Sequence, residues 1–162
     1  MIKAGLSTAF TVPEADAMTA AILHEVDRFA WLEQQARLLK SGNLGALDVP
    51  HLIAELESEM GNERRELYRR LRVLVAHLLK WQFQPAGRCN SWRGTIRIQR
   101  NDLARLFRET PSLRRFLSDE LAQAYPDAVE WAADETGLAD EDFPSACPYS
   151  TEEILGRDFW PD

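Results

Sequence analysis

The stretch from His51 to Gln84 limits the fold most, because it has the pattern of one long amphipathic helix. Its apolar residues recur at helical spacing and fall on one face: Leu52, Leu56, Met60, Leu67, Leu71, Leu74, Leu78 and Trp81. Such a helix would extend roughly 50 Å at 1.5 Å per residue. It can bury its stripe only if several other helices lie along it, so we expect a central helix surrounded by others.

Local signals define the ends of this central helix. Asp48 is well placed as its N-cap, and Pro50 falls in the first turn, where its missing N–H costs nothing. Pro85 disfavours helix at Gln84 and should end it. Gly61 costs about 1 kcal/mol relative to alanine in a helix interior, too little to break a packed helix. We therefore predict a continuous helix that could bend at Gly61.

Three further helices are predicted. The first begins near Glu14 or Asp16 and runs to Lys40, and whether residues 14–23 belong to it is left open. Its stripe consists of Ile22, Val26, Phe29, Leu32, Ala36 and Leu39. The next follows a cap at Ser91 and ends near residue 110. The last begins after Pro111 and ends at residue 137. Pro126 should kink this last helix.

The ends of the chain read differently from its middle. Residues 1–13 are predicted to be an unanchored tail, and residues 138–162 a mostly extended tail. Large apolar residues spaced through the second tail indicate that it packs on the helices, and residues 151–155 could form a short helix. The predicted fold is an all-α bundle of four main helices around one long central helix, with residues 14–162 as a single domain.

Length and composition fit a globular protein of one domain, since 45% of the 162 residues are hydrophobic. No apolar run approaches the 18 residues of a membrane helix, and residues 1–12 are too polar for a signal peptide. The two cysteines, Cys89 and Cys147, do not form a disulfide framework. These features favour a reduced, bacterial cytosolic setting and no membrane.

Charge is strongly segregated within the net charge of −7. Residues 1–61 carry 4 basic and 9 acidic residues, residues 62–116 carry 14 and 4, and residues 117–162 carry 1 and 13, so the segments have net charges of −5, +10 and −12. Segregation of this kind indicates charged partners, either within the chain or outside it.

Several short phrases, taken in order, are similar to those of a known family. They are Phe29-Ala30-Trp31-Leu32, Leu52-Ile53-Ala54-Glu55-Leu56-Glu57, His77-Leu78-Leu79-Lys80-Trp81-Gln82, Ser91-Trp92-Arg93, Pro111-Ser112-Leu113, Asp134-Glu135-Thr136-Gly137-Leu138 and Cys147-Pro148-Tyr149. Over roughly residues 25–160 the chain resembles the bacterial family called domain of unknown function twenty-nine. The resemblance implies a helical bundle. It implies no activity, cofactor or catalytic residue.

One candidate site is a pocket at the end of the bundle. His77 and Trp81 lie one turn apart on the central helix, and Trp92 and Arg93 follow just beyond the turn. These side chains could bind an anion. The alternative is that both tryptophans close the end of the core.

A second candidate is a divalent-metal site. Glu55 and Glu59 form an i, i+4 pair on the central helix, and Glu130 and Asp134 form another on the last helix. Four carboxylates from two facing helices could bind Mg²⁺ or Mn²⁺ and serve a metal-dependent hydrolase. Solvated surface acids are the alternative.

A third candidate is an arginine belt. Arg65, Arg69 and Arg72 share a face of the central helix, and a second row on the next helix contains Arg93, Arg97, Arg100 and Arg108. Arginine rows suit phosphate or nucleic acid. Two alternatives are neutralisation by the acidic last helix and an interface with a protein.

No catalytic set converges in the sequence. The three histidines and two cysteines show no zinc spacing, and Cys147 is read as a packing residue. The leading hypothesis is a small helical interaction or regulatory protein without catalysis or a cofactor, which binds a protein partner or itself.

Overall fold

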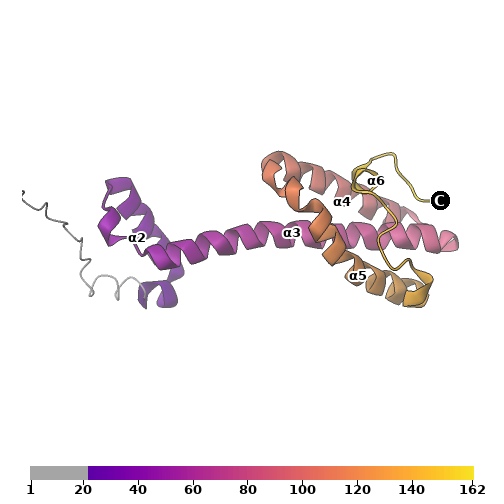
Figure 1. The fold of residues 1–162 in the computed structure, drawn as a ribbon, viewed down its shortest axis with the longest axis horizontal. Helices are drawn as coiled ribbons and strands as arrows, with labels where there is room; N and C mark the ends of the chain where they lie inside the picture. Colours follow the sequence, from indigo (N-terminus) through magenta and orange to yellow (C-terminus); the bar gives the residue numbers. More distant parts are fainter. Residues whose placement is uncertain (1–21) are drawn as a thin grey trace, which may run out of the picture. The chain divides into compact units, whose positions relative to one another are not determined.

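The computed structural model describes residues 22–162, and all regular elements in this range are helices (Figure 1). In chain order they are α2 (Arg28–Ser41), η1 (Leu44–Ala46), α3 (Val49–Phe83), η2 (Pro85–Gly87), α4 (Asn90–Glu109), η3 (Pro111–Phe116), α5 (Leu117–Thr136), η4 (Asp140–Asp142) and α6 (Thr151–Leu155), where η marks a 3-10 helix. Residues 22–26 are also helical. The predicted all-α class is confirmed. The predicted tail 1–13 lies outside the described residues.

Helix α3 is the central helix that the sequence predicts. It contains 35 residues and continues through Gly61 without interruption. The contacts divide the chain into two compact units, residues 1–59 and 60–162, and α3 contributes to both. The single domain expected over residues 14–162 stays a prediction. None of the helices within residues 22–162 is long and apolar enough to cross a membrane.

The prediction that the first helix runs without a break to Lys40 is wrong. The chain leaves the helical conformation at Asp27, which separates residues 22–26 from α2. Asp27 is the N-cap of α2, and its carboxylate accepts a 3.0 Å hydrogen bond from the backbone N–H of Ala30. The predicted stop is confirmed, because Gly42 ends α2 with a left-handed backbone, φ 72°.

The predicted buried stripe of this helix is also wrong. Ile22, Val26, Phe29, Leu32 and Leu39 are exposed in the structure. The buried residues of α2 are instead Trp31 and Gln35. Both form hydrogen bonds with Asp48, and these polar contacts determine which side of α2 is turned inward.

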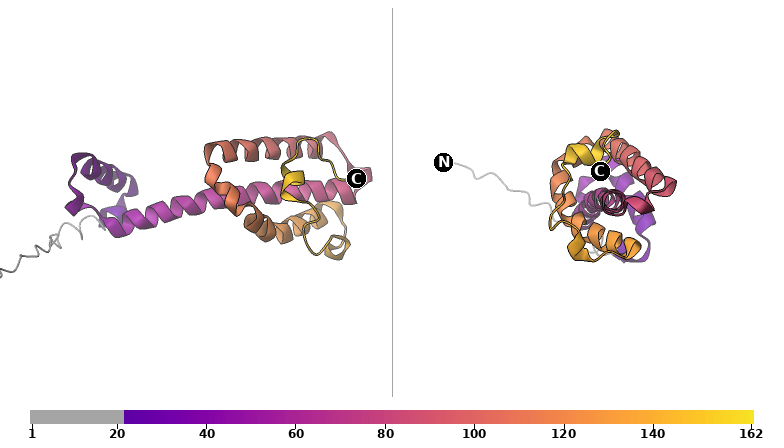
Figure 2. Two further views of the ribbon diagram at one scale, coloured as in Figure 1. Left: turned by 45° about the horizontal axis from the view of Figure 1, so that its top comes forward. Right: turned by 90° about the vertical axis from the view of Figure 1, so that its right-hand side faces the viewer.

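The second unit contains the hydrophobic core. Helices α4 and α5 lie on different sides of the C-terminal half of α3 (Figures 1 and 2). The predicted stripe of α3 is buried from Leu67 to Leu78, where it meets apolar residues of α4, η3 and α5, and its last member, Trp81, is half-buried. The fully buried members from these elements include Leu67, Leu71, Leu74, Leu78, Ile96, Leu103, Ala124 and Ala128. The first part of the stripe differs, because Leu56 and Met60 are exposed.

The remaining boundaries follow the sequence closely. Cys89 precedes α4 in place of Ser91, and η3 connects α4 to α5 at Pro111. Helix α5 contains Pro126 in its interior and ends at Gly137, φ 73°.

The C-terminal tail packs on this unit, as predicted. Phe143, Tyr149 and Ile154 are buried members of its core. The tail also forms the short helix α6, which has a capping box between Ser150 and Glu153.

Candidate functional site

A buried polar network holds the first unit together. Trp31 is fully buried, and its indole N–H donates a 3.1 Å hydrogen bond to the carboxylate of Asp48. The side-chain oxygen of Gln35 accepts a 2.9 Å hydrogen bond from the backbone N–H of Asp48. Trp31 and Gln35, one turn apart on α2, therefore both form hydrogen bonds with Asp48, the residue that precedes α3.

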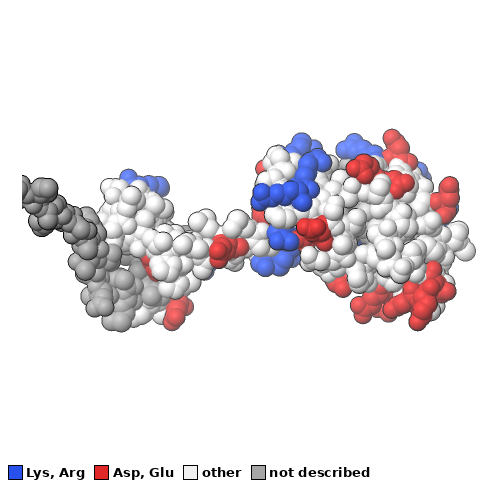
Figure 3. Space-filling view, in the orientation of Figure 1, with Lys and Arg blue, Asp and Glu red and all other residues white. Residues whose placement is uncertain are grey.

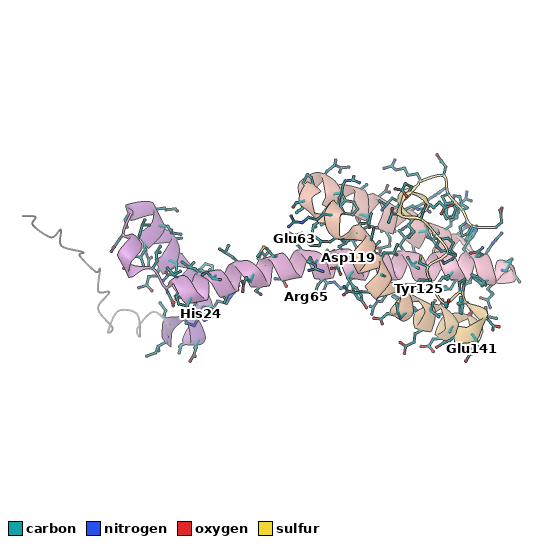
Figure 4. The ribbon with its side chains drawn as sticks, viewed as in Figure 1. His24, Glu63, Arg65, Asp119, Tyr125 and Glu141 are labelled. Atoms are coloured by element: carbon teal, nitrogen blue, oxygen red, sulfur yellow. The ribbon has the colours of Figure 1, made fainter. Side chains whose placement is uncertain are left out.

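Two histidines, each paired with a carboxylate, extend this network. His51 Nδ1 lies 2.8 Å from Asp48 Oδ2, and His24 Nε2 lies 2.9 Å from Glu55 Oε1. The two imidazole centroids are 4.4 Å apart (His24 is labelled in Figure 4). Arg28 Nε also donates a 2.7 Å hydrogen bond to Glu55.

Sequence reasoning missed this cluster, although its signal was present. His24 and Arg28 are four residues apart in the sequence, and His51 and Glu55 form an i, i+4 pair on α3. Neither pair has the spacing of a zinc site, so the signal is a weak one in the sequence.

The network keeps its carboxylates ionised. The hydrogen bond from Arg28, with a further one from His24, lowers the pKa of Glu55 to about 2. Burial works to raise the pKa of Asp48, but hydrogen bonds from His51 and Trp31 outweigh it and the pKa of Asp48 is lowered. Ionised carboxylates beside two imidazoles can hold the histidine side chains in place by hydrogen bonding.

Most of the large apolar residues of the described first unit are exposed to solvent rather than buried. Trp31 is the only buried apolar residue among the described residues of this unit. Nine large apolar residues of the same unit are exposed: Ile22, Val26, Phe29, Leu32, Leu39, Leu44, Val49, Ile53 and Leu56. In the described second unit only Met60 and Ile98 are exposed in this way. Much of the described first unit is white in Figure 3, without charged side chains in that view.

The four predicted metal ligands are divided between the two units. Glu55 and Glu59 lie in the first unit, whereas Glu130 and Asp134 lie on α5 in the second. Glu55 is engaged by His24 and Arg28. Within the part of the chain that the structure describes, no group of three or more His, Cys, Asp or Glu residues could hold a metal ion.

The second carboxylate pair faces an arginine. Glu130 and Asp134 line a hollow of about 390 Å³ together with Arg72, Asp127 and Trp131. Arg72 lies 3.9 Å from Asp127, and its guanidinium lies 5.4 Å from the ring centroid of Trp131. This surface can pair charges, which leaves less of its carboxylate charge for a cation.

The predicted residues at the end of α3 lie among aromatic rings. The centroids of Trp81 and Trp160 are 4.8 Å apart, and Arg93 lies 5.6 Å from the Trp160 centroid. His77 is buried and its Nδ1 lies 2.8 Å from the backbone oxygen of Val73. Burial lowers the pKa of His77, which favours the neutral ring.

Trp92, the remaining predicted member, lies against Lys80 of α3. The Lys80 side chain is 1% exposed, and its ammonium lies 4.6 Å from the Trp92 ring centroid and forms an ion pair with Glu135. These contacts fit the reading in which the tryptophans close the end of the core.

The arginine belt is divided by its surroundings. Arg69 pairs with Glu66 at 2.8 Å, Arg72 pairs with Asp127, and Arg65 binds the side-chain oxygen of Asn62. Figure 4 labels Arg65 on α3. In the second row, Arg97 is exposed.

Arg100 does not belong to an exposed belt, because it is 3% exposed. Its N–H groups donate to the backbone oxygens of Ile154 and Glu153. The C-terminal segment thus covers one arginine of the predicted row, and a continuous phosphate-binding strip along α4 is interrupted there.

Comparison with known proteins gives a family and no named relative. No curated protein and no solved structure matches the chain. The family model described as "Domain of unknown function DUF29" matches residues 23–160, which include almost all of the described chain. The chain therefore belongs to the DUF29 family.

Proposed function

We propose that this protein is a helical interaction protein that associates with a second copy of itself through the first unit. Its role would be regulatory, without catalysis. The observation that carries the proposal is the set of nine exposed large apolar residues in that unit, beside a single buried one among its described residues. A monomer seldom leaves so much apolar surface in contact with water.

The spacing of these residues favours a helix as the surface they meet. Val49, Ile53 and Leu56 are separated by steps of four and three on α3, the spacing that packs one helix against another. Phe29, Leu32 and Leu39 form a second exposed row on α2. Two copies related by a two-fold axis would each supply both rows, so that each apolar row of one copy could pack against an apolar row of the other.

The amount of apolar surface suits a stable dimer. A standard interface takes about 800 Å² and 20–30 residues from each partner, with apolar residues at its centre. Nine large apolar residues can supply such a centre, and exposed acids such as Glu33 and Glu57 can supply a polar rim.

A cytosolic setting is part of the proposal, and the free thiols of Cys89 and Cys147 support it.

The experiment is to measure molar mass by light scattering across a hundredfold range of protein concentration. Ile53→Lys places a charge in the α3 row, where Ile53 is 51% exposed, so the fold of the chain is spared. Ile98→Lys is the matched control, because Ile98 is 58% exposed on α4 in the second unit. We expect the wild type and Ile98→Lys to be dimers and Ile53→Lys to be monomeric.

Two results would reject the proposal. A wild-type chain that stays monomeric at every concentration excludes self-association, and a different protein must then cover the apolar residues. A dimer that Ile53→Lys leaves intact and Ile98→Lys dissociates would place the interface in the second unit.

A further inference from the structure

A small basic hollow lies between α4 and the C-terminal segment, within the second unit. It has a volume of about 290 Å³ and is lined by Arg97, Arg100, Asn101, Arg157 and Asp158. This volume is close to the lower end of the range of about 300–1,000 Å³ for small-molecule pockets. The hollow can therefore hold a small ligand or one group of a larger one.

Arg100 is the residue that makes this hollow more than a surface depression. It is 3% exposed, yet only two of its three nitrogen atoms form hydrogen bonds: Nε donates to Ile154 O at 2.9 Å, and Nη2 donates to Glu153 O at 3.3 Å. Its Nη1 is buried without a hydrogen-bond partner, and the guanidinium carbon lies 5.7 Å from the centroid of the Trp160 ring. A buried charged donor without an acceptor is costly, so an acceptor that reaches it would bind favourably.

The charges around the hollow favour an anion with two negative charges. Arg97, Arg100 and Arg157 contribute three positive charges against one negative charge from Asp158. Arg97 and Arg157 form no ion pair within the described residues, and both are exposed, so their side chains can turn toward a ligand. An unpaired excess of two positive charges matches a phosphate monoester.

We propose that this hollow binds a phosphate monoester group of a small soluble molecule. Guanidinium groups present paired N–H donors that match the oxygens of phosphate, and Asn101 adds an amide donor beside them. A polynucleotide would need a row of such contacts along its backbone, whereas this site is a single short hollow. The site lies entirely in the second unit and is independent of the apolar rows of the first.

The test is titration calorimetry on the full-length protein with inorganic phosphate and with glycerol 3-phosphate at about pH 8, where a monoester carries nearly two charges. Arg157→Gln removes one exposed cation from the hollow, and Arg108→Gln removes an exposed cation of α4 outside it. We expect saturable binding of both probes. Arg157→Gln should weaken it about tenfold or more, as the loss of one charged hydrogen bond would.

Asp158→Asn provides a change in the opposite direction. Removal of the only carboxylate that lines the hollow should tighten binding, while Arg108→Gln should leave it unchanged. Absence of saturable heat with both probes at about 10 mM, a range that reaches millimolar affinity, would overturn the proposal. Equal weakening by Arg108→Gln and Arg157→Gln would overturn it as well, because it would indicate general attraction of anions. Tighter binding of a single-stranded oligonucleotide than of the monoester would assign the site to nucleic acid instead.

Discussion

The indole N–H of Trp31 and the carboxylate of Asp48 form a 3.1 Å hydrogen bond between two buried residues. This bond joins α2 to the start of α3 at the centre of the first unit. Trp31 is the sole buried apolar residue among the described part of this unit. The orientation of α2 therefore depends on directional polar contacts more than on apolar packing.

Trp31→Phe should lower the free energy of unfolding by about 1–3 kcal/mol, because it leaves the buried carboxylate of Asp48 without one of its donors. Trp131→Phe is a useful comparison, since Trp131 donates a 2.6 Å hydrogen bond to the exposed carboxylate of Glu135. Its loss should cost less, because water can replace the donor. Urea denaturation followed by circular dichroism measures both, and an equal cost for the two variants would contradict the argument.

Glu55 should make stability depend on acid pH. Its pKa is lowered from 4.5 to about 2 by Arg28 and His24, so the ionised form is favoured in the folded state. The resulting stabilisation is complete above about pH 4.5 and is lost as the pH falls toward about 2.

The measurement is thermal unfolding of wild type and Glu55→Gln between about pH 7 and pH 2. The difference between the two melting temperatures should be largest near neutral pH and should shrink in acid. Glu57→Gln, an exposed neighbour on α3, serves as the control and should show a smaller difference throughout. A constant gap between wild type and Glu55→Gln would argue against the Arg28–Glu55 contact.

Local patterns in the sequence were sufficient for the helical class and for most of the second unit. The spacing from Leu67 to Leu78 identifies the buried face of α3, and Pro111 and Gly137 mark the ends of α4 and α5. These features depend on residues close together in the chain, so periodicity and capping rules detect them.

Contacts between distant residues explain what the sequence could not predict. Which side of α2 is buried depends on Asp48, which is 17 residues from Trp31. Arg100 looks like an exposed member of a row, but carbonyl groups 53 and 54 residues further along the chain accept its hydrogen bonds. A helical pattern shows that a stripe exists, and only the tertiary partners decide whether it is covered.

Lys80 and Glu135 provide a test of a buried charge. Lys80 is 1% exposed, and Glu135 is its counter-charge. Glu135→Gln should cost about 1–3 kcal/mol of unfolding free energy, since it leaves the ammonium with a neutral partner and the Trp92 ring.

Lys80→Met removes the charge instead and keeps the length of the side chain, so it should cost less than Glu135→Gln. Adding Glu135→Gln to Lys80→Met should then have little effect, because no buried charge remains to be compensated. Denaturant unfolding of the three variants gives the coupling energy. Additive costs in the double variant would show that the pair contributes nothing as a pair.

Two glycines should respond to alanine in opposite directions. Gly61 lies inside α3, where an added Cβ would meet only the end of the Arg65 side chain, at 3.3 Å from Nη1. Gly61→Ala should stabilise the chain by up to about 1 kcal/mol, because alanine loses less backbone entropy in a helix.

Gly137 ends α5 with φ 73°. Gly137→Ala should destabilise the chain by about 1–2 kcal/mol through left-handed backbone strain, although its Cβ would meet nothing within 4 Å. Thermal unfolding of both variants distinguishes the two effects. A Gly61→Ala variant that is less stable than the wild type would mean that α3 depends on a glycine at this position, and its continuity through residue 61 would then need another explanation.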